Sequence, residues 1–124
     1  MPVITAATAK AHQFDGATWK SFVSPSRGSS ELVAWRAEIP AGAPTSPHRV
    51  NHEEVVYVLR GRLRLEHDGS AEIAEAGDVV VVPADTDVHI TNPGDETAET
   101  WVTTRVGFAG IMPDGSRFEP PWVK

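Results

Sequence analysis

The stretch SPHRVNHEEVVYVLRG, residues 46–61, carries two of the five histidines of the sequence. His48, His52 and Glu54 stand close together at its centre. Imidazole nitrogens and carboxylate oxygens are ligands that zinc and non-haem iron take, and the same groups act as general acids and bases. The stretch therefore indicates either a metal site or an acid–base site. The choice between them depends on the strand face that each side chain occupies.

The composition limits the kinds of protein that this chain can be. With 124 residues and 40% hydrophobic side chains, it is expected to fold as one domain around one core. Its formal net charge of −6 argues against a nucleic-acid partner, and the absence of cysteine excludes disulfides and thiolate metal sites. The sequence has neither a signal-peptide pattern at its start nor an apolar run of membrane-spanning length. We therefore expect a cytoplasmic protein with no membrane partner.

Short strands separated by turns make up most of the sequence. Residues 32–39, LVAWRAEI, alternate inward apolar and outward side chains with the period of two that marks a half-buried strand. Asp68-Gly69 is a hairpin turn signal, and Pro83 ends a run of valines. Such short strands, at a spacing of roughly 8–12 residues, are typical of an all-β sandwich or barrel. Further strands are expected over residues 53–59, 61–67, 77–83, 88–92 and 97–106, with one or two strands in the first 25 residues and an irregular tail over the last 14.

Two longer patterns connect these strands to a known family. One is HRVNHEEVVYVLRG, and the other is GDVVVVPADTDVHITN, which contains glycine, proline and asparagine at a second set of spacings. Both resemble the paired motifs of the cupin family: His-x-His, three or four residues, Glu, six residues, Gly; then Gly, five residues, Pro-x-Gly-x-x-His, three residues, Asn. The residues in register with these motifs are His48, Glu54, Gly61, Gly77, Pro83 and Asn92.

The resemblance to cupins implies a fold and an assembly. Cupins are small antiparallel jelly-roll β-barrels with a ligand cavity between two sheets. We accordingly expect residues 1–124 to form a single cupin domain, with the motif-bearing barrel over about 30–105, N-terminal strands within 1–29 and a tail over 106–124. Cupins often pair as dimers, so a homodimer is expected, with Tyr57 at the subunit contact.

In the cupin family, three histidines and the glutamate commonly hold one divalent metal. Carried over position by position, His48 and Glu54 match two of these ligands. Val50 and Val88 stand where the family has its other two histidines, and neither can coordinate a metal. His89 lies one step beyond, where the alternation of the strand turns it to the outer face. The resemblance thus implies a metal site that has lost two ligands, and no cofactor is favoured.

His52 provides an alternative set of metal ligands. By strand parity it shares a face with His48 and Glu54, so it could replace a missing histidine. Two histidines and one carboxylate suit iron, manganese or zinc, and the protein would then be a metal-dependent dioxygenase or isomerase. In the other interpretation, His52 caps the loop before the strand or contacts solvent.

Without a metal, Glu54 and His48 form a candidate catalytic acid–base pair. Burial raises the pKa of a carboxyl group, and a neighbouring imidazolium lowers it, so the two groups are tuned by their surroundings. Such a pair suits isomerisation, dehydration or cyclisation through an enol. Parity also predicts an apolar cavity that binds a small apolar or aromatic organic molecule, although each wall residue is equally an ordinary core residue. The expected substrate-binding residues are Trp35, Val50, His52, Val56, Val88, Ile90 and Trp101.

Three classes of function therefore remain open from the sequence. The first is a non-redox biosynthetic enzyme of the cyclase, isomerase or dehydratase type, which the Glu54–His48 pair favours. The second is a metal-dependent cupin that uses His52, and the third is a ligand-binding or sensing module without turnover. The arginines at positions 60, 62 and 64 are expected on a solvated or subunit-contact face, because the chain as a whole is acidic.

Overall fold

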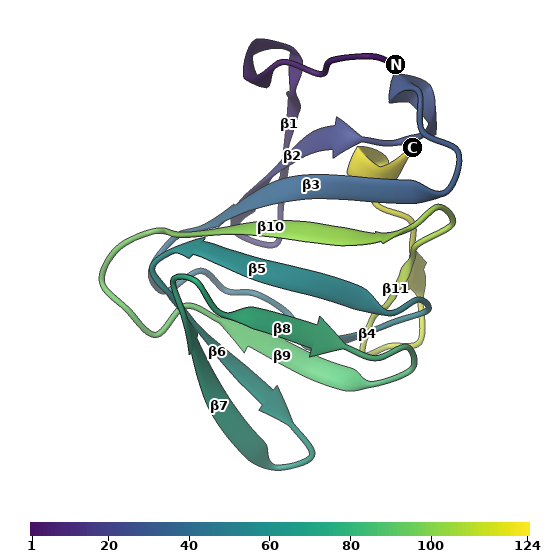
Figure 1. The fold of residues 1–124 in the computed structure, drawn as a ribbon. Coiled ribbons are helices and arrows are strands. Elements are labelled where there is room, and N and C mark those ends of the chain that lie inside the picture. Colours follow the sequence, from purple (N-terminus) through teal and green to yellow (C-terminus); the bar gives the residue numbers. More distant parts are fainter.

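The computed structural model describes all residues from 1 to 124 and consists of strands joined by turns. Its strands form two six-stranded sheets, paired antiparallel throughout, that face each other as in a jelly roll (Figure 1). The predicted all-β architecture is confirmed, in the form of two facing sheets. No helix in the structure has the length and apolar character needed to cross a bilayer. Three short 3-10 helices complete it: η1 (Ala6–Thr8), η2 (Pro25–Arg27) and η3 (Pro121–Val123).

The first sheet has the strand order β1-β2-β3-β10-β5-β8. Its inward side chains come from alternate positions of each strand, so that in β3 Val33, Trp35 and Ala37 are buried while Arg36 faces outward. The bounds of its strands are β1 Lys10–Phe14, β2 Ala17–Val23, β3 Leu32–Ile39, β10 Ala98–Arg105, β5 Glu54–Arg60 and β8 Val79–Val82.

The second sheet has the order β12-β11-β4-β9-β6-β7. It closes the core from the other side, with Leu63 of β6 and Val50 of β4 completely buried. The two strands that carry the first motif therefore lie in different sheets, because β4 belongs to this sheet and β5 to the first. The bounds of its strands are β12 Arg117–Phe118, β11 Gly110–Ile111, β4 His48–Val50, β9 Asp87–Thr91, β6 Arg62–His67 and β7 Ser70–Glu75.

Two Asp-Gly turns close the hairpins β1–β2 and β6–β7. In both, the aspartate and the glycine have positive φ, at 56° and 76° for Asp15 and Gly16 and at 49° and 75° for Asp68 and Gly69. Two consecutive positive φ values define the type I′ turn, whose twist matches that of the flanking strands. The turn predicted at Asp68-Gly69 is confirmed, and so are the strands expected in the first 25 residues.

The last 14 residues have little regular structure, as expected, but they are anchored to both sheets. The short strands β11 and β12 extend the edge of the second sheet, and η3 then packs on the first sheet. Ser21 Oγ of β2 donates a hydrogen bond of 2.8 Å to the carbonyl oxygen of Trp122. Strand propensity did not reveal this anchoring, because the tail is held by contacts with residues about 100 positions earlier in the chain.

The two Asp-Gly turns provide a matched test of backbone packing. A Cβ atom on Gly16 would lie 2.5 Å from Pro44 Cδ, whereas a Cβ on Gly69 would meet nothing within 4 Å. We expect Gly69→Ala to lower the free energy of unfolding by about 1–2 kcal/mol, the cost of a left-handed non-glycine residue. Gly16→Ala should cost about 1–3 kcal/mol more, because it also overpacks Pro44. Equal losses in urea denaturation would show that Pro44 yields freely and that this contact does not fix the hairpin.

Candidate active site

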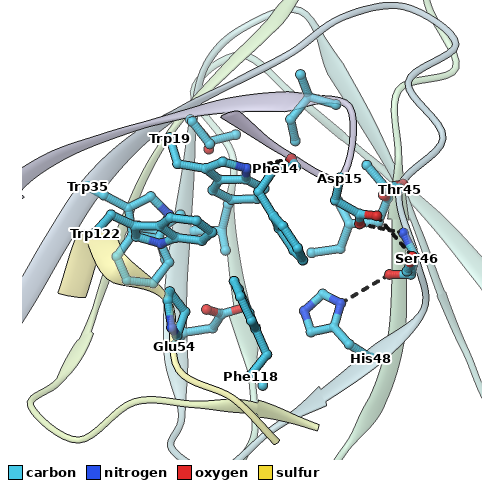
Figure 2. Close-up of a pocket in the computed structure, with 18 of the residues that line it drawn as sticks. Phe14, Asp15, Trp19, Trp35, Thr45, Ser46, His48, Glu54, Phe118 and Trp122 are labelled. Atoms are coloured by element: carbon cyan, nitrogen blue, oxygen red, sulfur yellow. Dashed lines mark hydrogen bonds between the residues drawn. The ribbon is translucent and has the colours of Figure 1, made fainter. Parts of the chain in front are cut away.

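A cavity of about 100 Å³ lies between the sheets, and 13 of its 21 lining residues are hydrophobic. Glu54 reaches it from β5 of the first sheet, and His48 from β4 of the second (Figure 2). No lysine or arginine lines it. An apolar cavity with a few polar groups is the usual form of a small-molecule site. Its other polar lining residues are Asp15, Thr45, Ser46 and Thr100.

Glu54 is a buried carboxyl group without a protein partner. It begins β5 opposite Val82 of β8, and strand alternation turns it inward with Val56. Its side chain makes no hydrogen bond or ion pair with another residue, and only 5% of the residue is exposed. Burial raises the pKa of Glu54 to about 7, because removing water disfavours the charged form. Near neutral pH the group can therefore either accept or donate a proton.

His48 is held by the loop that precedes it. Its Nδ1 lies 3.2 Å from the carbonyl oxygen of Ser46, which can only accept, so Nδ1 carries the hydrogen. In the neutral ring the lone pair is then on Nε2, which Figure 2 shows on the side of the ring away from Ser46. Asp15 fixes this loop by accepting hydrogen bonds from the amide of Ser46, at 2.6 Å, and from its hydroxyl, at 2.9 Å. The β1–β2 hairpin thus orients His48 through Ser46.

Aromatic rings from the two ends of the sequence form much of the cavity wall. Phe14 stacks on Phe118 with ring centroids 4.2 Å apart, and Trp19 stacks on Trp122 at 4.8 Å. All four rings line the cavity together with Trp35 (Figure 2). Of these five rings, only Trp35 was predicted from the sequence. The Asp15-Gly16 turn signal could have indicated the hairpin, but nothing in the local pattern shows that the tail returns to it.

The predicted wall residues divide into three groups. Trp35, Val56 and Ile90 line the cavity as predicted. Val50 and Val88 are buried in the core but do not line the cavity. Trp101 and His52 lie elsewhere, each for a different reason.

Trp101 differs most from its predicted place. It alternates with the inward Thr100 and Val102, so it lies on the outer face of β10. There its ring packs near Phe22, with centroids 5.4 Å apart, and its indole N–H donates to the hydroxyl of Thr103. The prediction assigned Trp101 to the wrong parity of its strand.

His52 does not line the cavity either, although parity with Glu54 predicted that it would. It lies in the loop where the chain passes from one sheet to the other, so strand alternation does not continue through it. Asn51 pins this loop by donating to the carbonyl of Gly107 and accepting from the amide of Ala109. His52 Nε2 consequently lies beside Gly107, 3.6 Å from where a Cβ of that glycine would be.

His89 takes the outward position expected from its strand. Its Nε2 lies 2.8 Å from the carbonyl oxygen of Thr45 and donates to it, and the residue is absent from the cavity wall.

The side chains of this protein that could act as metal ligands do not fit a divalent metal. No group of three or more His, Cys, Asp or Glu side chains is close enough to hold one. The cavity wall contains one imidazole, that of His48, and the carboxylates of Glu54 and Asp15, but these three side chains do not come close enough to share an ion, and Asp15 already accepts hydrogen bonds from Ser46.

Comparison with known proteins places this geometry in a family. The polyketide cyclase RemF from Streptomyces resistomycificus has a similar structure, with a TM-score of 0.76 at 20% identity over 85% of this chain and 79% of that one. The chain is 30% identical over 96 residues to acetate kinase EutQ of Salmonella typhimurium, covering 73% of this chain and 41% of that protein. It is 36% identical over 58 residues to mannose-6-phosphate isomerase 1 of Arabidopsis thaliana, covering 47% and 13%.

These likenesses differ in what they establish. At 20% identity the match to RemF shows a common fold. The chain spans less than half the length of either curated relative. The family itself is shown by a model described as a cupin domain, which matches residues 35–104 and so more than half of the chain. This protein belongs to the cupin family.

Proposed function

We propose that this protein is a non-redox enzyme that moves a proton on a small apolar or aromatic organic molecule. The observation that carries the proposal is Glu54, a buried carboxyl group in an apolar cavity with no protein partner and a pKa raised to about 7. A general acid or base is most effective when its pKa lies near the working pH. The reactions that suit it are isomerisation, dehydration and cyclisation through an enol.

In this mechanism the ionised Glu54 removes a proton from a carbon next to a carbonyl group of the substrate. The electron pair of that C–H bond forms the carbon–carbon double bond of an enolate, and the carbonyl oxygen takes the charge. Protonated His48 donates to this oxygen from Nε2, while its Nδ1–H stays bound to Ser46. Glu54 then returns its proton to another carbon of the delocalised enolate as the carbonyl group re-forms. In a cyclisation, the enolate carbon instead attacks a second carbonyl group, the first carbonyl re-forms, and the new alkoxide takes the proton from Glu54. No step requires a metal, in keeping with the donor set.

The comparisons support an enzyme of this kind without specifying one. Two of the similar proteins carry the names of a polyketide cyclase and an isomerase. Another is named as an acetate kinase, so the cupin fold does not determine the chemistry. The proposal therefore rests on Glu54 and its surroundings.

We also propose that the protein acts as a homodimer, through the outer face of β5 and β8. Val55 and Tyr57 of β5 pair with Val81 and Val79 of β8, and their side chains are 38–56% exposed. β8 is the edge of the first sheet, and it contains four valines and no charge. An uncharged edge strand with an apolar face favours association, and a second copy brings a surface of the same chemistry to it.

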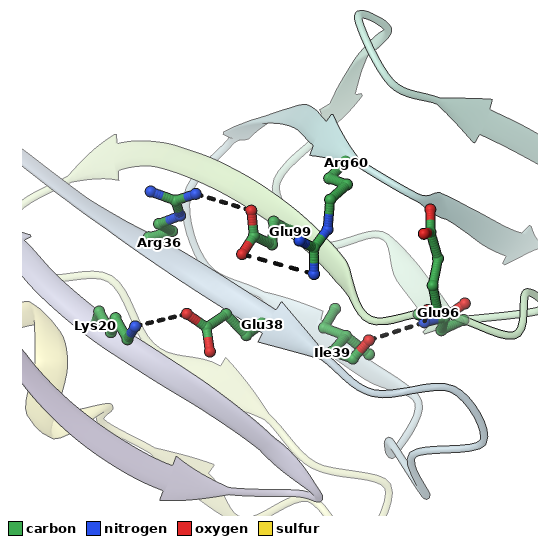
Figure 3. Close-up of polar contacts among 8 residues, drawn as sticks. Lys20, Arg36, Glu38, Ile39, Arg60, Glu96 and Glu99 are labelled. Carbon is green, nitrogen blue, oxygen red and sulfur yellow. Dashed lines mark hydrogen bonds and ion pairs between the residues drawn. The ribbon is translucent and has the colours of Figure 1, made fainter.

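Beyond this apolar strip on β5 and β8, the outer face carries the Trp101 and Phe22 rings, which pack near each other, and charged side chains that pair within one chain. Glu99 accepts a hydrogen bond of 2.8 Å from Arg36 and lies 4.0 Å from Arg60, and Lys20 pairs with Glu38 at 2.6 Å (Figure 3). Because these charges are already paired, the apolar strip on β5 and β8 is the part of the face that still lacks a partner. The dimer contact is therefore centred on that strip.

Deuterium incorporation tests the proposed reaction on a mixture of candidate substrates. Small-molecule extracts incubated with the protein in D₂O should yield at least one compound that gains solvent deuterium, and a chelator should not prevent this. Glu54→Gln keeps the shape but cannot transfer the proton, so incorporation should fall by roughly 10²–10⁴-fold. Trp101→Ala, on the outer face, is the control and should retain it. A compound that binds the wild type but never exchanges or changes would identify a binding module instead.

Light scattering during size exclusion tests the dimer. The wild type should have twice the 13.4 kDa mass of one chain. Val81→Glu places a charge in the strip and should give single chains, whereas Ile73→Glu, at an equally exposed apolar position on β7, should leave the dimer intact. A wild type of single mass, or dissociation by both variants alike, contradicts this contact.

A further inference from the structure

Residues 112–124, here called the strap, cross the open side of the sandwich. The chain leaves β11, forms β12 on the edge of the second sheet and then reaches β2 of the first sheet, where Ser21 donates a hydrogen bond to the carbonyl oxygen of Trp122. Ser26 Oγ likewise donates to the carbonyl oxygen of Lys124. The strap is thus fastened to both sheets. Its residues that line the cavity are Met112, Phe118, Pro120 and Trp122.

Two ring pairs close the gap that the strap crosses. Phe14 ends β1, the edge strand of the first sheet, and Phe118 ends β12, the edge strand of the second. Their rings lie 4.2 Å apart and nearly parallel, at 12°, so one stacked pair joins the two edges. Trp122 stacks on Trp19 at 4.8 Å and 5°, further along the same side. Figure 2 shows these rings together at the cavity.

Trp122 takes up space in the cavity wall without making a polar contact from its ring. The residue is 4% exposed, and its indole N–H has no hydrogen-bond partner. A buried, unpaired donor costs free energy, so the indole is held by packing against Trp19 and Trp35. The indole of Trp122 therefore affects the site through the space that it fills.

The space that remains is small for a ligand cavity. It measures about 100 Å³, whereas sites for drug-sized ligands are about 300–1,000 Å³. An engineered cavity of about 150 Å³ holds benzene. With the strap closed, the volume of the cavity is thus nearer to that of a cavity that holds a single six-membered ring than to that of a site for a drug-sized ligand.

We propose that the strap sets the upper size of the ligand, with Phe118 and Trp122 as the residues that determine specificity. The ligand class is a neutral organic molecule the size of one six-membered ring. This inference rests on the proposed function only in using the same cavity, because it concerns binding and requires no turnover. Removing the indole of Trp122 enlarges the cavity and admits a second ring.

Calorimetric titration with phenol and 2-naphthol tests the size limit, since these probes differ by one fused ring. The wild type should bind phenol at least about tenfold more tightly, because a ring that does not fit must displace packed side chains. In Trp122→Ala the preference should disappear or reverse. Trp101→Ala removes the same side chain from the outer face and should keep the wild-type preference.

Two milder variants cover the case in which Trp122→Ala fails to fold. Trp122→Leu and Phe118→Leu keep part of the buried volume, and each should lower the preference for phenol. The inference is overturned if the wild type binds 2-naphthol as well as phenol, if it binds neither, or if the folded strap variants keep the wild-type ratio. The same titrations on Glu54→Gln separate the two proposals. If the wild type keeps its preference for phenol but neither it nor any variant incorporates deuterium, the catalytic proposal is refuted and the size limit stands.

Discussion

The burial of one ionisable carboxyl group is the constraint on which the rest of this site depends. Glu54 points into a cavity that contains no lysine or arginine, and no protein donor reaches it. A charged carboxylate in such surroundings is costly unless it is paired, so the group takes up a proton instead, and its pKa rises to about 7. By the resemblance of the two sequence motifs, Val50 and Val88 stand where cupins commonly have metal-binding histidines, and the role proposed for Glu54 is proton transfer.

The elements around Glu54 supply the aromatic wall of the cavity and position His48. The rings at the ends of the two edge strands, Phe14 and Phe118, close the side of the sandwich and keep the cavity apolar. The same hairpin carries Asp15, whose bonds to Ser46 fix the loop that orients His48. One hairpin therefore contributes both to the aromatic wall of the cavity and to the orientation of the imidazole.

Strand parity oriented some of the predicted side chains correctly and misplaced others, Trp101 within a strand and His52 in a loop. It oriented Glu54 inward and His89 outward, because alternation in a paired strand leaves no other choice. It misplaced His52, since the chain changes sheets at that loop and the alternation starts again. The aromatic strap was not predictable from local pattern, because Phe118 and Trp122 are held by stacking on residues about 100 positions away.

The pH dependence of stability tests the state of Glu54 most directly. A pKa raised from 4.5 to about 7 means that the folded protein binds the proton more tightly than the unfolded chain. The associated stability is complete below pH 4.5 and is lost as the pH rises toward 7, by an amount on the order of 3 kcal/mol at about 1.4 kcal/mol per pKa unit. Glu54→Gln, which mimics the protonated form, should match the wild type near pH 4.5 and become the more stable protein at pH 8. A Gln variant that is less stable than the wild type at pH 8 would show an ionised, paired carboxylate and contradict the account.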